Sequence, residues 1–155
     1  MRIMSTAFDS ATEMPRRYTC EGKNISPPLA WEAVPEEAKS LALVVLDPDA
    51  PDPAAPAQTF VHWVLYDIPT NIEGLAEGAD LTATNINHGV NDFGSTAYGG
   101  PCPPVGNHRY FHQLYALDTT FDSLDQPSWA ELEQAMEGHV LEKAELIGRY
   151  EKKYS

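Results

Sequence analysis

Leu41-Ala-Leu-Val-Val-Leu46 is apolar on both faces of an extended chain and has two adjacent valines near its centre. Such a run is typical of a β-strand that is buried on both sides. Phe60-Val-His-Trp-Val-Leu-Tyr66 and Tyr110–Leu117 are rich in the same aliphatic, β-branched and aromatic residues. Prolines, glycines or polar residues follow these stretches and interrupt strands. We therefore expect a central β-sheet that contains all three.

Shorter elements are expected on either side of these strands. Arg2–Phe8 is a short β-prone opening, and the residues from Pro28 to Trp31 favour an edge strand with the indole packed inside. Leu81–Ile86 predicts a further strand. The residues from Asn87 to Gly100 are rich in Gly, Asn and Asp and indicate a long loop, and loops of that length are often functional.

The C-terminal part of the chain has a different pattern. Ser128-Trp-Ala-Glu131 matches a capping box and predicts the start of a helix, which Gly138 should end. We expect Val140–Glu145 to add another turn or two of helix and Leu146–Tyr150 to form a last strand. With no repeat or linker, residues 1–155 are expected to form one domain. The fold class predicted is mostly β and antiparallel, with peripheral C-terminal helices.

Composition excludes several classes of partner. The chain of 155 residues has 23 acidic and 10 basic residues and a formal net charge of -13. This charge repels nucleic acid and anionic membrane surfaces, so we expect neither nucleic-acid binding nor stable membrane association. Met1 is followed by no apolar stretch of signal-peptide length, and no later run approaches the ~20 residues of a membrane span. These features predict a cytoplasmic protein.

The chain has two cysteines, Cys20 and Cys102, which are far apart in sequence. Neither belongs to a CxxC motif or has a histidine at metal-binding spacing. Reduced thiols are therefore expected in the cytoplasm, with a disulfide left open as the alternative. A catalytic role for Cys102 is not expected, because it lies between two prolines with no evident base.

Asp47-Pro-Asp49 follows the buried strand and is a candidate site. Two carboxylates at positions i and i+2 lie on one face of an extended chain. Either they share a proton, so that one stays protonated and donates to an anion, or both are ionised and accept hydrogen bonds from an ammonium. Alternatively, each aspartate caps a turn. The segment fails the calcium-loop pattern, because the twelfth position is Gln58 rather than Glu.

Histidines supply the remaining candidates. His62 stands among bulky residues of a predicted strand and is either a core histidine or a site residue. His108 and His112 resemble a metal pair, but four strand residues span ~13 Å, so no metal site is expected. The residues from Tyr98 to Tyr110 form a loop rich in glycine and proline, which is either a tight turn or the wall of a site.

Several motifs occur in the order found in one family. They are Cys20-x-Gly-x-Asn-x-Ser-Pro-x-Leu-x-Trp31, Asp47-Pro-Asp-Ala-Pro51, Phe60-Val-His-Trp-Val64, Asn91-Asp-Phe-Gly94 and Tyr98-x-Gly-Pro-x-Pro-Pro-x-Gly-x-His-Arg-Tyr110. Together they resemble the phosphatidylethanolamine-binding protein family, also called the Raf kinase inhibitor protein family, in its bacterial and archaeal branch.

The resemblance implies a central antiparallel sheet, a second smaller sheet packed on it, and a small anion pocket at one end. The ligand-binding residues carried over from the family are Asp47, Asp49, His62, Gly100, Pro101, His108 and Tyr110. The family often has a cis peptide beside this pocket, and Ala50-Pro51 is the candidate. Arg109 alternates away from its neighbours on the strand and is expected to form a structural ion pair.

The function expected is binding of phosphate or phosphorylated head groups, with modulation of a kinase or protease partner. No cofactor and no catalytic residue are predicted. The resemblance also implies a homodimer. Two alternatives are a hydrolase that uses His62 or His108 as base beside an aspartate, and a protein-interaction module with a vestigial pocket.

Overall fold

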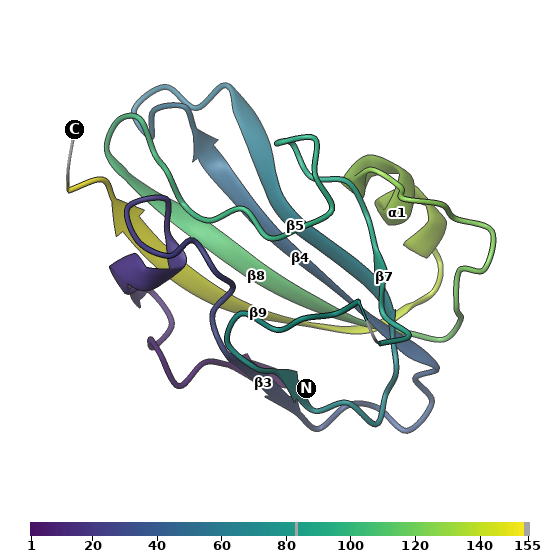
Figure 1. Ribbon diagram of the computed structural model, residues 1–155. Helices are drawn as coiled ribbons and strands as arrows, with labels where there is room; N and C mark the ends of the chain where they lie inside the picture. Colours follow the sequence, from purple (N-terminus) through teal and green to yellow (C-terminus); the bar gives the residue numbers. More distant parts are fainter. Residues whose placement is uncertain (83, 154–155) are drawn as a thin grey trace.

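Two β-sheets form the framework of the protein (Figure 1). The computed structural model describes residues 1–82 and 84–153. The six-stranded sheet has the order β2 (Thr12–Glu13), β9 (Val140–Glu151), β8 (Asn107–Leu117), β4 (Ser40–Ala50), β5 (Gln58–Ile68) and β7 (Asn87–His88). The three-stranded sheet has the order β1 (Arg2–Met4), β3 (Leu29–Glu32) and β6 (Gly74–Leu75). Neighbouring strands are antiparallel, except that β2 runs parallel to β9. The sequence-based expectation of two mostly antiparallel sheets is confirmed.

The central strand β4 separates two hydrophobic cores. Leu41, Leu43 and Val45 join the core that the small sheet covers, where they meet residues such as Trp31 of β3. Ala42 and Val44 point to the opposite face and pack in a second core. Because strand side chains alternate between faces, a strand covered on both faces must be apolar at every position. This explains the apolar run of β4, of which Leu41 to Val44 are fully buried.

The second core is covered by helix α1 (Trp129–Met136), which lies on the side of the large sheet away from β3 (Figure 1). Leu132 and Met136 of this helix are buried in that core. The Ser128 hydroxyl accepts a hydrogen bond from the Glu131 backbone N–H, and the Glu131 carboxylate accepts one from the Ser128 N–H. The predicted capping box is therefore confirmed.

The structure corrects the prediction of further helical turns at 140–145. Strand β9 begins at Val140 and pairs with β8 along its whole length, from Val140 opposite Leu117 to Glu151 opposite Asn107. Gly138 has a φ of 83° in the turn that precedes the strand. The first half of β9 is exposed and mixed in composition, so that its sequence favours neither state. The long ladder with β8 therefore determines that these residues form a strand. Within the described residues, the chain has one C-terminal α-helix.

Two smaller predictions are also wrong. Of the segment expected to form a strand from Leu81 to Ile86, residues 81–82 and 84–86 form no strand, and the Thr84 N–H bonds to the Leu81 carbonyl. Ala83 of this segment lies outside the described residues. Both apolar ends of the segment are buried, which accounts for the strand-like pattern. Strand β3 lies in the middle of the small sheet and not at an edge.

The two cysteines form a disulfide, with their Cα atoms 5.4 Å apart. It joins the segment after the 3₁₀ helix η1 (Arg16–Tyr18) to the loop that precedes β8. A bond of 3.0 Å from the Cys20 N–H to the Pro101 carbonyl holds the same two segments together. The expectation of reduced thiols is therefore wrong, because a sequence separation of 82 residues gave no sign of this proximity.

Candidate functional site

A cavity of about 300 Å³ opens where β4 ends and where β5 and β8 begin. Antiparallel pairing of β4 with both neighbours brings these three strand ends together. The residues that line the cavity are Asp47, Ala50, Pro51, Gln58, Phe60, His62, Phe93, Cys102, Pro103, Pro104, His108 and Tyr110. The Ala50–Pro51 peptide bond at its edge is cis. The cavity thus has a polar floor and a largely apolar wall.

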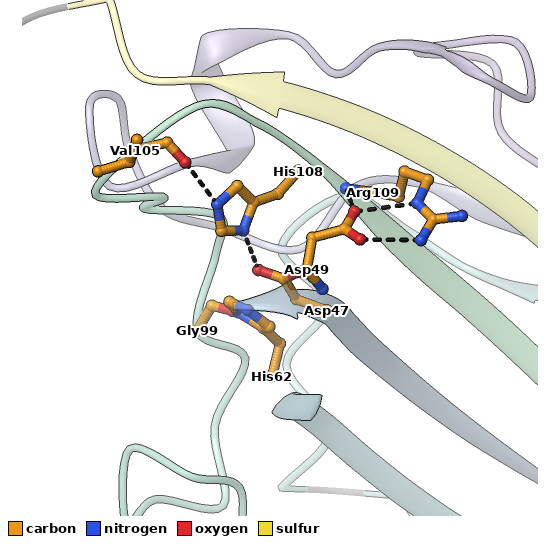
Figure 2. A network of polar contacts seen from close by, with 7 residues as sticks. All are labelled: Asp47, Asp49, His62, Gly99, Val105, His108 and Arg109. Atoms are coloured by element: carbon orange, nitrogen blue, oxygen red, sulfur yellow. Dashed lines mark hydrogen bonds and ion pairs between the residues drawn. The ribbon is translucent and has the colours of Figure 1, made fainter. Parts of the chain in front are cut away.

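Asp47 and His108 form a buried pair in the floor of the cavity (Figure 2). The His108 Nδ1 lies 2.6 Å from the Asp47 Oδ2, and its Nε2 lies 2.8 Å from the Val105 carbonyl oxygen. A carbonyl only accepts, so Nε2 donates to it. Both ring nitrogens of His108 therefore have oxygen partners, which hold the ring against Asp47.

Asp49 has a different partner from Asp47. Its Oδ1 accepts from the Arg109 Nη2 at 2.8 Å, and its Oδ2 accepts from the Arg109 Nε at 2.9 Å. The Arg109 backbone N–H donates to the same Oδ2. The expected ion pair of Arg109 is confirmed, and the shared proton expected between the two aspartates is wrong. The cause is register: His108 and Arg109 are successive residues of β8, and each takes one carboxylate.

The Asp49–Arg109 pair predicts a contribution to acid stability. The hydrogen bonds from Arg109 hold the pKa of Asp49 below its ordinary value of 3.8. A lowered folded-state pKa stabilises the fold above the unfolded-state value, and this contribution disappears as pH falls through the folded-state value. We expect Asp49→Asn to lower the free energy of unfolding at pH 7 by about 1 kcal/mol, since Arg109 is partly exposed. Urea unfolding from pH 7 to about pH 3 should show a shallower acid decline in the variant than in the wild type. An unchanged pH profile would contradict the assignment.

His62 and Tyr110 supply the other polar groups of the cavity. The His62 Nδ1 lies 2.7 Å from the Gly99 carbonyl oxygen, and burial lowers the pKa of this histidine. Burial also raises the pKa of Tyr110, and the Asp47 carboxylate adds to the shift through its charge and a weak hydrogen-bond interaction. The Tyr110 Oη is buried, and no group of the described residues lies within full hydrogen-bond distance of it. At neutral pH the cavity therefore presents an uncharged imidazole and a phenol O–H.

An aromatic wall that sequence reasoning missed stands beside these groups. Phe93 contacts His62 edge-on, with ring centroids 5.4 Å apart, and contacts Phe60 in the same manner at 4.8 Å. Asn91 positions this wall: its Oδ1 accepts from the Phe93 N–H and its Nδ2 donates to the His62 carbonyl. Phe93 is 51% exposed, so it lies at the mouth of the cavity. The motif from Asn91 to Gly94 was the one sequence feature that pointed to this wall, although it did not indicate a role for Phe93.

The structure gives the predicted glycine loop a supporting role. The Gly99 N–H donates to the His62 carbonyl at 3.2 Å, and the Gly100 N–H donates to the Asn24 Oδ1 at 2.8 Å. Both amides are therefore occupied and are not free for an anion. A side chain at Gly100 would collide with the Tyr18 carbonyl oxygen. Gly100 and Pro101, like Asp49, are outside the cavity lining and instead hold the residues that form it.

The histidines of β8 are held separately. His112 is fully buried, and its Nδ1 lies 3.0 Å from the Tyr110 carbonyl oxygen, whereas His108 is held by Asp47 and Val105. Across residues 1–82 and 84–153, no three His, Cys, Asp or Glu side chains are arranged to hold a metal ion. In the same part of the chain, no helix is long and apolar enough to cross a membrane.

Two sheets with a cavity of polar floor and largely apolar wall at one end of the larger sheet are typical of a ligand-binding fold. The family described as phosphatidylethanolamine-binding protein matches residues 4–151. The chain therefore belongs to the phosphatidylethanolamine-binding protein family, as its motifs suggested.

Relatives agree with this assignment over nearly the full chain. A UPF0098 protein of Methanothermobacter thermautotrophicus is 48% identical, with 97% of this chain and 98% of the relative covered. The crystal structure of a phosphatidylethanolamine-binding protein homologue from Chlamydia trachomatis is 39% identical, with a TM-score of 0.90 and coverage of 98% and 97%. The structure of the E. coli protein YbcL, described as a member of the mammalian family, is 30% identical, with a TM-score of 0.87 and 98% of each chain covered.

Proposed function

We propose that the cavity binds a small anion, namely phosphate or a phosphorylated head group. The observation that carries the proposal is the buried Tyr110 Oη, which lines the cavity without a hydrogen-bond partner among the described residues. Buried polar groups are nearly always satisfied, so such a hydroxyl calls for a partner that enters the cavity. Its pKa is raised, so it offers a donor, which an anion requires.

Electrostatics support an anion despite the acidic surface of the protein. His108 lines the cavity, and its ring is paired with one carboxylate, that of Asp47. The Asp49 carboxylate is neutralised by Arg109 outside the cavity lining. Each of the two carboxylates near the cavity therefore has a basic partner, although the whole chain carries -13. Donors in such a site bind anions through charge-assisted hydrogen bonds.

The hydrolase alternative has less support from the geometry. A general base needs a free nitrogen, and both nitrogens of His108 are engaged. His62 retains Nε2, but the cavity lining offers it no serine or threonine, and its cysteine is in a disulfide. We therefore propose binding rather than catalysis. Modulation of a kinase or protease, homodimer formation and a cytoplasmic location stay predictions.

Phosphate titration followed by NMR tests the proposed function. We expect millimolar phosphate, an affinity of about 4 kcal/mol, to shift signals of His62 and Tyr110. Tyr110→Phe should weaken binding about tenfold, because it removes one hydrogen bond to a charged ligand. Tyr115→Phe is the matched control: its hydroxyl donates to Gln113 and is outside the cavity lining, so the affinity should not change. Absence of any shift at saturating phosphate, or an equal loss of affinity in Tyr110→Phe and Tyr115→Phe, would contradict the proposal.

A further inference from the structure

We propose that the cavity selects oxyanions that carry a hydroxyl proton, such as a phosphomonoester monoanion, over oxyanions without one, and that His62 determines this selection. The inference rests on the proposed anion site and specifies its ligand class. It excludes phosphodiesters and sulfate esters as preferred ligands, because the monoanion of neither carries an O–H.

The first step is the tautomer of His62. Its Nδ1 lies 2.7 Å from the Gly99 carbonyl oxygen, which only accepts, so the hydrogen of the neutral ring is on Nδ1. The Gly99 N–H returns a bond to the His62 carbonyl, which fixes the two backbones together. Phe93 packs against Gly99 so closely that a side chain there would collide with its ring. The Gly99 carbonyl is therefore a fixed acceptor, and Nε2 is left as a lone pair for the ligand.

The second step is the charge of the ring. His62 is 4% exposed and is enclosed by the rings of Phe60, Phe93 and Tyr110. Burial lowers the pKa of His62 and outweighs the Gly99 hydrogen bond and the carboxylates of Asp47 on β4 and Asp92 after β7, which favour a proton on the ring, whereas His108 on β8 opposes one. At neutral pH the ring is therefore uncharged in the free cavity, so Nε2 accepts and does not donate.

The third step is complementarity. Tyr110 offers an O–H donor, whereas the His62 Nε2 offers an acceptor to the same cavity. A phosphomonoester monoanion has charged oxygens for the donor and one P–OH for the acceptor. A sulfate ester or a phosphodiester has oxygens alone, so one of them would face the Nε2 lone pair. That arrangement leaves a buried acceptor unsatisfied and places two electron-rich atoms in contact.

Ligands that all carry a single negative charge and differ in whether they have an O–H test the effect of that O–H separately from the effect of charge. At about pH 5.5, methyl phosphate is mainly a monoanion with one P–OH, because the second pKa of a phosphomonoester is near 6. The ¹⁵N shift of the His62 Nε2 in the free protein at this pH confirms the neutral ring before any ligand is added. Dimethyl phosphate and methyl sulfate are monoanions without one. We expect methyl phosphate to bind about tenfold more tightly than either, the effect of one hydrogen bond in a buried site. Phosphoethanolamine against glycerophosphoethanolamine then distinguishes a free phosphorylated compound from a lipid-type diester head group.

Substitution of His62 assigns the selection to this residue. His62→Gln replaces the lone pair with an amide that donates or accepts, so the tenfold preference should fall to near unity. His139→Gln, on the surface and paired with Asp118, should retain it. If His62→Gln fails to fold, the ¹⁵N chemical shift of the His62 Nε2 in the wild type tests the proposal instead. This shift should remain in the range of an unprotonated nitrogen when methyl phosphate binds. Equal binding of all three monoanions, or protonation of His62 on binding, would overturn the selection and leave the anion site standing. Absence of binding by all three would overturn both.

Discussion

His108→Ala is expected to lower the free energy of unfolding by about 3–5 kcal/mol, the usual cost of removing one partner from a buried ion pair. The His108 side chain is 0% exposed and that of Asp47 is 5% exposed. Without the imidazole, the Asp47 Oδ2 loses its 2.6 Å partner and keeps its charge away from water. The Val105 carbonyl loses its donor as well. Chemical unfolding at pH 7 measures the loss, with an unchanged m value as the sign of an intact fold.

An exposed pair of the same chemistry provides the control. The His139 Nδ1 lies 2.8 Å from the Asp118 Oδ1, and the two side chains are 45% and 43% exposed. Water replaces the lost partner there, so His139→Ala should have a much smaller effect than His108→Ala. Similar losses in the two variants would show that the loss is not caused by burial of an unpaired charge.

A second substitution tests the reason for the loss. Adding Asp47→Asn to His108→Ala removes the charge and leaves a neutral group of similar size. The double variant should therefore be more stable than His108→Ala alone, although each change by itself destabilises the protein. Additive losses would contradict the buried ion pair and would instead favour a packing role for the ring.

The strands that could be predicted are those whose local pattern and tertiary environment agree. Leu41 to Leu46 is apolar at every position because it lies between two cores, and this uninterrupted apolar run can be recognised in the sequence. Residues 140–145 are exposed in the first half of β9, so no hydrophobic period marks them. Their strand conformation depends on the distant ladder with β8, which local pattern does not reveal.

The residues of the site, like the strands, could be predicted only in part from the sequence. The motifs identified Asp47, His62, His108 and Tyr110, all of which line the cavity. The sequence did not indicate which basic side chain forms a hydrogen bond with each aspartate. Asp47 and Asp49 are two residues apart, so local spacing favours a shared proton, whereas the register of β8 gives each aspartate its own basic partner. Hydrogen bonds between distant strands decide which groups remain free for a ligand.

The Cys20–Cys102 disulfide is expected to contribute about 4 kcal/mol to the free energy of unfolding. It closes a loop with a sequence separation of 82 residues, and a loop of that length restricts the unfolded chain strongly. Both cysteines are exposed, so a soluble reductant can reach them in the folded protein. Reduction should lower the melting temperature by about 10 °C for a chain of this size.

The effect on the cavity follows from the position of the bond. Cys102 lines the cavity, and Val105, three residues later, supplies the carbonyl that holds the His108 Nε2. Reduction frees this segment from the Cys20 side, so phosphate affinity should fall together with stability. A Cys20→Ser, Cys102→Ser variant is the control: it should match the reduced wild type and should not respond to reductant. An unchanged melting temperature after reduction, with both thiols detected by a thiol assay, would contradict the stabilising role.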